Sequence, residues 1–97
     1  MVSKDSVIEA LKTVEDPELF LDIWFLGLIY HIGIEDSGRV NIEMTFTSPM
    51  CPAGPQLVHD IKDKVGKVEG VTGVEVTVVF VPPWAPSEDV KQTLGIG

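Results

Sequence analysis

Three segments in which apolar and polar residues alternate constrain the fold of this chain most strongly. They run from Leu28 to Glu35, from Arg39 to Thr47 and from Val74 to Val81. Alternation places successive side chains on opposite faces of a strand, so each segment is predicted as a strand with one apolar face. Asp36-Ser37-Gly38 separates the first two segments and predicts a hairpin turn, in which Gly38 is free to take a positive φ.

The remaining segments show helical spacing of their apolar residues. Helices are predicted over residues 6–14, 55–68 and 87–94. Ser6 and Glu9 have the spacing of a capping box at the start of the first helix, and Ser87 is the expected cap of the last. The predicted order of elements is therefore α-β-β-α-β-α.

This order predicts a single α+β domain over residues 1–97. The hairpin makes the first two strands antiparallel, and the helical crossover makes the third strand parallel to the second, with a right-handed connection. The result is a three-stranded mixed sheet with its helices packed mainly on one face. Val79 and Val81 lie on the nominally polar face of the third strand, which suggests that the Trp84 tail or a partner partly covers that face.

Charge and cysteine content exclude several classes of protein. Seven Lys plus Arg against fifteen Asp plus Glu give a net charge of -8, which excludes a general nucleic-acid binder and disfavours an anionic membrane surface. The chain lacks both an apolar run long enough for a membrane-spanning helix and a signal-peptide pattern at its start. Cys51 is the only cysteine, which excludes an intramolecular disulfide and fits a reducing compartment. We therefore expect a cytoplasmic protein.

The segment around Cys51 is where the sequence points to chemistry. It lies between a predicted strand and a predicted helix, and the positive end of a helix dipole lowers the pKa of a nearby thiol. The hydroxyl groups of Thr47 and Ser48 could donate hydrogen bonds to a thiolate or a bound group. The alternative is that Cys51 is a small buried apolar residue, as lone cysteines often are.

An acidic cluster made of Asp16, Glu18 and Asp22 follows the first predicted helix. It fits either turn formation beside Pro17 or contacts with a metal or a partner. No spacing of ligands resembles a closed zinc site. One cysteine cannot hold an iron–sulfur cluster alone, so any such cluster must be shared with a partner or a second copy.

Histidines and large aromatic residues supply weaker indications. A thiol enzyme needs a base beside Cys51, and His31 and His59 are the histidines of the chain. Trp24, Phe25 and Trp84 lie next to predicted loops, where they could pack onto the core or form a docking surface.

Four motifs together resemble one protein family. They are Asp16-Pro17-Glu18-Leu19, Leu26-Gly27-Leu28-Ile29-Tyr30, the segment Thr45-Phe46-Thr47-Ser48-Pro49-Met50-Cys51-Pro52, and Pro82-Pro83-Trp84. In this order, they resemble the metal–sulfur cluster biosynthetic family, which includes PaaD-like proteins and iron–sulfur assembly accessory factors. The resemblance extends from about Val7 to Leu94 and implies a compact domain with a mixed sheet.

The resemblance also implies a function. It identifies Cys51 as the functional thiol, with Asp16, Glu18, Thr47 and Ser48 around it. It implies an accessory factor that handles a transient iron–sulfur cluster with carrier or client proteins, and it leaves a homodimer open. Phe20-Leu21 stands where many relatives have a small residue such as glycine, so the sequence departs from the family pattern beside the expected site.

Three functional hypotheses follow. The first is an accessory factor in iron–sulfur cluster assembly or transfer that uses Cys51. The second is a small thiol-dependent enzyme, which requires a base within reach of Cys51. The third is a protein-interaction module in which Cys51 is structural.

Overall fold

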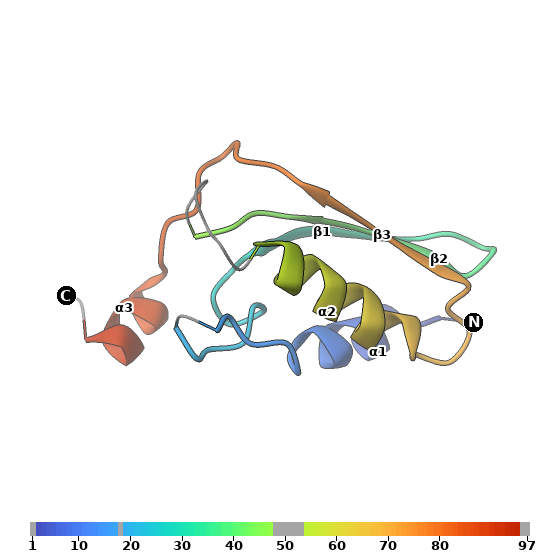
Figure 1. The fold of residues 1–97 in the computed structure, drawn as a ribbon, viewed down its shortest axis with the longest axis horizontal. Coiled ribbons are helices and arrows are strands. Elements are labelled where there is room, and N and C mark those ends of the chain that lie inside the picture. Colours follow the sequence, from blue (N-terminus) through green and yellow to red (C-terminus); the bar gives the residue numbers. More distant parts are fainter. Residues whose placement is uncertain (1, 18, 48–53, 96–97) are drawn as a thin grey trace.

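The computed structural model describes residues 2–17, 19–47 and 54–95. Its elements follow the predicted order (Figure 1): α1 Lys4–Leu11, β1 Ile29–Ile34, β2 Arg39–Met44, α2 Gly54–Gly66, β3 Gly73–Val78 and α3 Glu88–Leu94. The α-β-β-α-β-α arrangement expected from the alternating and helical patterns is confirmed.

The sheet has the predicted topology. Its strand order is β1-β2-β3, with β1 antiparallel to β2 and β2 parallel to β3. The hairpin turn closes with a hydrogen bond of 2.9 Å from the Gly38 amide to the Glu35 carbonyl. Gly38 has a φ of 93°, so glycine is required at this turn for the reason that the sequence indicated.

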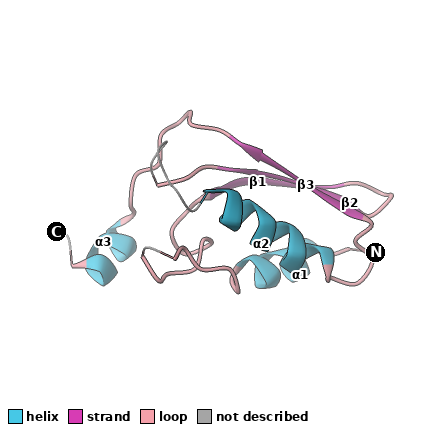
Figure 2. Cartoon of the chain, viewed as in Figure 1, coloured by secondary structure: helices cyan, strands magenta, loops and turns pink. Residues whose placement is uncertain are grey.

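The core lies between the sheet and two helices. Figure 1 and Figure 2 show α1 and α2 beneath one face of the sheet. The middle strand contributes every second residue to this core, and the helices contribute residues at helical spacing. The side chains that meet there are Val40, Ile42, Met44, Leu57, Ile61, Val65, Val7 and Leu11.

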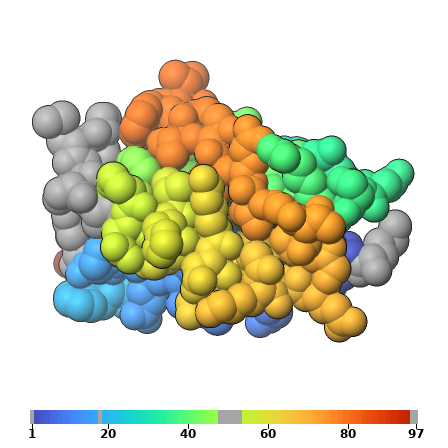
Figure 3. Space-filling model, turned by 45° about the vertical axis from the view of Figure 1, so that its right-hand side comes forward, coloured from blue at the N-terminus to red at the C-terminus, as the bar shows by residue number. Residues whose placement is uncertain are grey.

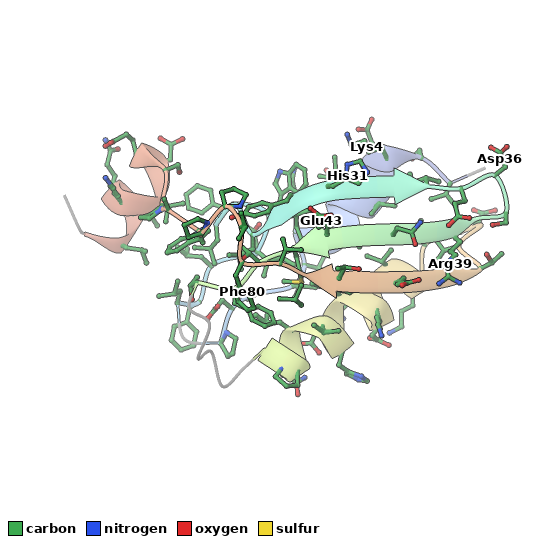
Figure 4. All side chains as sticks on the ribbon, turned by 90° about the horizontal axis from the view of Figure 1, so that it is seen from above. Lys4, His31, Asp36, Arg39, Glu43 and Phe80 are labelled. Carbon is green, nitrogen blue, oxygen red and sulfur yellow. The ribbon has the colours of Figure 1, made fainter. Side chains whose placement is uncertain are left out.

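The opposite face of the sheet is polar and is not covered by a described helix. His31, Glu43 and Thr77 lie at paired positions across the three strands, and Figure 4 views the sheet from this side. β3 ends at Val78 rather than at Val81. Val81 is 83% exposed, so the Trp84 tail does not cover it, and cover by a partner stays a prediction.

The helix ends differ from the predicted ones at one cap and agree at another. α1 begins earlier than expected because the Ser3 side chain accepts a hydrogen bond of 3.1 Å from the Ser6 amide. The capping box at Ser6 is therefore wrong, since Ser6 already lies inside the first turn. At α3 the Ser87 hydroxyl oxygen accepts from the Val90 amide at 3.3 Å, which confirms the predicted cap.

A β-bulge interrupts the predicted alternation in β1. The register with β2 shifts between Ile29 and His31, so Tyr30 is an extra residue on the bulged strand. The Tyr30 hydroxyl donates a hydrogen bond of 2.9 Å to the Pro82 carbonyl. The bulge thus directs Tyr30 toward the segment that follows β3, instead of placing it in the apolar row with Ile32.

Candidate functional site

The candidate site lies at the end of the molecule where β2 and β3 finish. Because these strands are parallel, their carboxyl ends meet at one edge of the sheet, where α/β folds commonly bind ligands. α2 begins at the same end, and the segments before β1 and after β3 also approach it (Figure 1). This is the part of the fold that holds the two ends of the segment containing Cys51.

Aromatic packing fixes both ends of that segment. A Cβ atom added to Gly54, the first residue of α2, would lie 2.6 Å from Cε2 of Phe46. The Phe46 ring also makes an edge-to-face contact with Phe80, with ring centroids 6.2 Å apart and an interplanar angle of 65°. The end of β2, the start of α2 and the chain after β3 are therefore packed together through one ring.

Two long-range hydrogen bonds hold the segment after β3 in place. The Trp84 indole Nε1 donates to the Leu26 carbonyl at 2.6 Å, and the Tyr30 hydroxyl donates to the Pro82 carbonyl. Trp84 and Trp24 are both half-buried and pack against the core. The packing interpretation of these two tryptophans is therefore confirmed.

Replacing Trp84 with phenylalanine is expected to lower the free energy of unfolding by about 1 kcal/mol, because the carbonyl of the buried Leu26 loses its indole donor. The matched control is Tyr30→Phe, which removes an exposed hydrogen bond and is expected to cost under about 0.5 kcal/mol. Urea unfolding of both variants measures the difference. Equal losses would show that the indole bond has no special part in holding the segment.

Asp16 lies in a tight turn between α1 and β1. Its side chain is 1% exposed, and Oδ1 accepts a hydrogen bond of 3.2 Å from the Leu19 amide. The Asp16 carbonyl also accepts from the Phe20 amide at 2.8 Å, and the Asp16 amide donates to the Leu21 carbonyl at 2.9 Å. These contacts give Asp16 a direct part in shaping the turn.

Only some of the other predicted site residues lie within the described part of the chain. Thr47 is half-buried and is the last described residue of its segment. Cys51, Ser48 and Glu18 lie outside the described residues. Asp22 belongs to the turn segment, where its Oδ1 accepts a hydrogen bond of 2.7 Å from the Phe25 amide.

The two histidines are both exposed and lie on different elements. His31 is on β1, where it lines a small pocket with Lys4 and Trp24. Figure 4 shows His31 at the sheet edge nearer α1, whereas α2 lies toward the other edge. His59 is on α2, in its second turn. His31 therefore does not lie on the side of the sheet where α2 follows the Cys51 segment, and it gives no support to the hypothesis of a thiol enzyme.

No group of three or more His, Cys, Asp or Glu side chains within residues 2–17, 19–47 and 54–95 could hold a metal ion. Among the same residues, no helix is both long and apolar enough to cross a membrane.

Sequence reasoning missed two features of this end of the molecule. The Phe46–Gly54 contact depends on tertiary packing, and only the glycine at the predicted helix start hinted at a close approach. Phe20 has a φ of 58° and is 75% exposed. Its departure from the small residue expected by resemblance was the available signal.

Comparison with protein families gives a match over most of the chain. The sequence profile described as "Iron-sulfur cluster assembly protein" matches residues 4–78, from the start of α1 to the end of β3. The matched region includes both ends of the candidate site and the segment between them.

Individual proteins are similar to this chain over nearly its whole length. The Bacillus subtilis Fe-S protein maturation auxiliary factor YitW is 38% identical over 96 residues, covering 96% of this chain and 94% of YitW. A conserved hypothetical protein from Thermotoga maritima, whose structure is solved, is 43% identical with a TM-score of 0.86, covering 98% of this chain and 96% of that one. An iron–sulfur cluster carrier protein from Synechocystis is 33% identical over 95 residues, covering 98% of this chain but 27% of that protein.

Proposed function

Because this chain belongs to the iron–sulfur cluster assembly protein family, we propose that it acts as an accessory factor in the assembly of iron–sulfur clusters or their transfer to client proteins. The observation that carries the proposal is the family match over residues 4–78. The similarity to a maturation auxiliary factor over nearly the full length of both chains supports the same role.

Cys51 is the thiol that we assign to this function. It is the only cysteine in the chain, and thiolates are the usual protein ligands of iron–sulfur clusters. The packing of Phe46 against Gly54 supports the assignment, because it holds the two ends of the Cys51 segment against the sheet. Thr47, Ser48, Asp16 and Glu18 complete the proposed site as neighbours that shape it or donate hydrogen bonds.

The cluster is cargo in this proposal and is held only transiently. A single thiolate leaves most of the ligand positions of a cluster open. The remaining ligands must come from a second protein, which is either a partner or another copy of this chain. Sharing of this kind favours transfer, since each protein holds the cargo incompletely.

The partners that we propose are iron–sulfur carriers and client proteins. In the Synechocystis carrier protein, the region that matches this chain and the rest of the carrier belong to one polypeptide, which supports a carrier as a partner. A lone thiol functions best in a reducing compartment, so we place the activity in the cytoplasm.

The proposal predicts that Cys51→Ser reduces the activation of an iron–sulfur client enzyme at least about tenfold, because serine is a poor ligand in place of a thiolate. The measurement is client activity in cells that lack the native chain and express either variant or wild type. The matched control is Met50→Leu, which changes the neighbouring residue without touching a thiol. Full client activity with Cys51→Ser, at equal protein level, would contradict the proposal.

A further inference from the structure

Phe20, in the turn between α1 and β1, is a large apolar residue in a backbone conformation that favours glycine. The Phe20 amide donates to the Asp16 carbonyl at 2.8 Å, which closes a single helical turn. The residue that ends such a turn commonly adopts the left-handed conformation, and glycine is the usual choice there. Phe20 has a φ of 58°, in the left-handed region that is a true outlier for a bulky residue.

Folding gains little from phenylalanine at this position. The side chain is 75% exposed, so it removes little apolar surface from water. Glycine would adopt the same φ without strain. Phe20 therefore occupies a backbone conformation that favours glycine, and its side chain adds little to the packing of the core. Such a residue is best explained by a contact with another molecule.

A second exposed aromatic residue belongs to the same loop. Phe25 is 36% exposed, and its amide is tied to the Asp22 carboxylate at 2.7 Å. In Figure 3 this loop, in light blue, lies at the surface at one end of the molecule. The aromatic docking residue indicated by the structure is therefore Phe20, in a loop held by hydrogen bonds, and not Trp84, whose indole is bonded inside the fold.

The charged residues within this loop are all acidic. No Lys or Arg occurs between Thr13 and Gly38, whereas Glu15 is exposed and Asp22 is half-buried within the same loop. The net charge of the whole chain is -8. A surface that fits Phe20 must therefore offer an apolar pocket and basic residues beside it.

We propose that Phe20 is the anchor of a docking surface, formed by the described loop residues 15–17 and 19–27, for a cluster carrier protein that presents an apolar pocket bordered by Lys and Arg. The inference rests on the proposed function, which supplies the carrier as partner. A second copy of this chain fits poorly, because two loops of like charge would face each other.

The test measures binding of the full chain to a purified iron–sulfur cluster carrier protein from the same organism by isothermal titration calorimetry. Phe20→Gly is expected to weaken binding at least about tenfold, as loss of an aromatic anchor does. The same variant is expected to have a Tm that is unchanged or raised by up to about 4 °C, because glycine relieves the left-handed backbone. Loss of binding together with a lowered Tm would overturn the proposal.

Charge variants test the electrostatic part. Glu15→Lys is expected to weaken binding several-fold at low salt and to reduce its salt dependence, since screening acts on exposed charges. Glu69→Lys makes the same change after α2, where Glu69 lines a pocket with Ser3 and Ser6, and is expected to leave binding unchanged. Equal effects of the two variants would show a general charge effect and would overturn a localised surface.

The outcomes separate this inference from the proposed function. Failure of the wild-type chain to bind the carrier, or wild-type affinity in Phe20→Gly, overturns the docking surface even when client activation still depends on Cys51. Loss of client dependence on Cys51, with carrier binding still dependent on Phe20, would instead overturn the proposed function. Analytical sedimentation tests the alternative of self-association. If the wild-type chain sediments as a dimer and the Phe20→Gly variant as a monomer, the surface joins two copies of this chain, and the carrier proposal is overturned.

Discussion

Replacing Gly54 with alanine is expected to lower the free energy of unfolding by about 2 kcal/mol, which is typical of overpacking in a core. The new Cβ would lie 2.6 Å from Cε2 and 2.9 Å from Cζ of Phe46, distances that van der Waals contact does not allow. The Phe46 ring must move and would lose its edge-to-face contact with Phe80. Because this ring joins the two ends of the Cys51 segment, client activation should also fall.

Gly66 provides the matched control, since it is the last residue of the same helix. Apart from its chain neighbours and the backbone of the helix itself, nothing lies within 4 Å of a Cβ added there. Gly66→Ala should therefore leave stability unchanged or raise it by up to about 1 kcal/mol, through the better helix propensity of alanine. Urea unfolding of the two variants separates the effects. A Gly54→Ala protein as stable as wild type would show that the Phe46 contact does not constrain the site.

Ile42→Ala is expected to cause the largest loss of stability, about 3 kcal/mol. Ile42 is in the central strand, is 1% exposed, and is paired with Ile32 on one side and Val76 on the other. Truncation leaves a cavity between the sheet and the helices that the rigid strand pairing prevents from collapsing.

Glu43→Ala is the control for this variant, because it changes the adjacent residue on the open face. Glu43 is exposed and has no ion pair among the described residues. The expected change in the free energy of unfolding is within about 0.5 kcal/mol. Calorimetric Tm values of the two variants give the comparison, and similar losses would contradict the assignment of the two faces.

The fold could be predicted from the sequence wherever apolar residues recur with the spacing of a strand or a helix and without interruption. Val40, Ile42 and Met44 alternate without interruption, and all three are buried as the pattern requires. The pattern failed at Tyr30, because a bulge depends on the hydrogen bonds of neighbouring strands and leaves the spacing of residues unchanged. It failed at Ser6 because Ser3 offers an equally suitable cap one turn earlier.

The sequence predicted where the candidate site lies in the chain, but not the side-chain contacts that form it. A strand followed by a loop and a helix located the Cys51 segment, and the confirmed β2 and α2 bracket it. The contact of Phe46 with both Gly54 and Phe80 joins residues that only the folded sheet brings together. The left-handed backbone at Phe20 could not be predicted from propensity, which favours glycine at such a position, and only the departure from the small residue expected by resemblance pointed to it.

In the proposed function, the Cys51 thiol takes part in passing a cluster to a client. The most direct measurement follows cluster transfer from a loaded carrier to an apo client by visible absorption under anaerobic conditions, with wild-type chain, Cys51→Ser or no addition. We expect faster transfer with the wild-type chain, and transfer with Cys51→Ser no faster than with no addition. Equal acceleration by wild type and Cys51→Ser would contradict the proposed function.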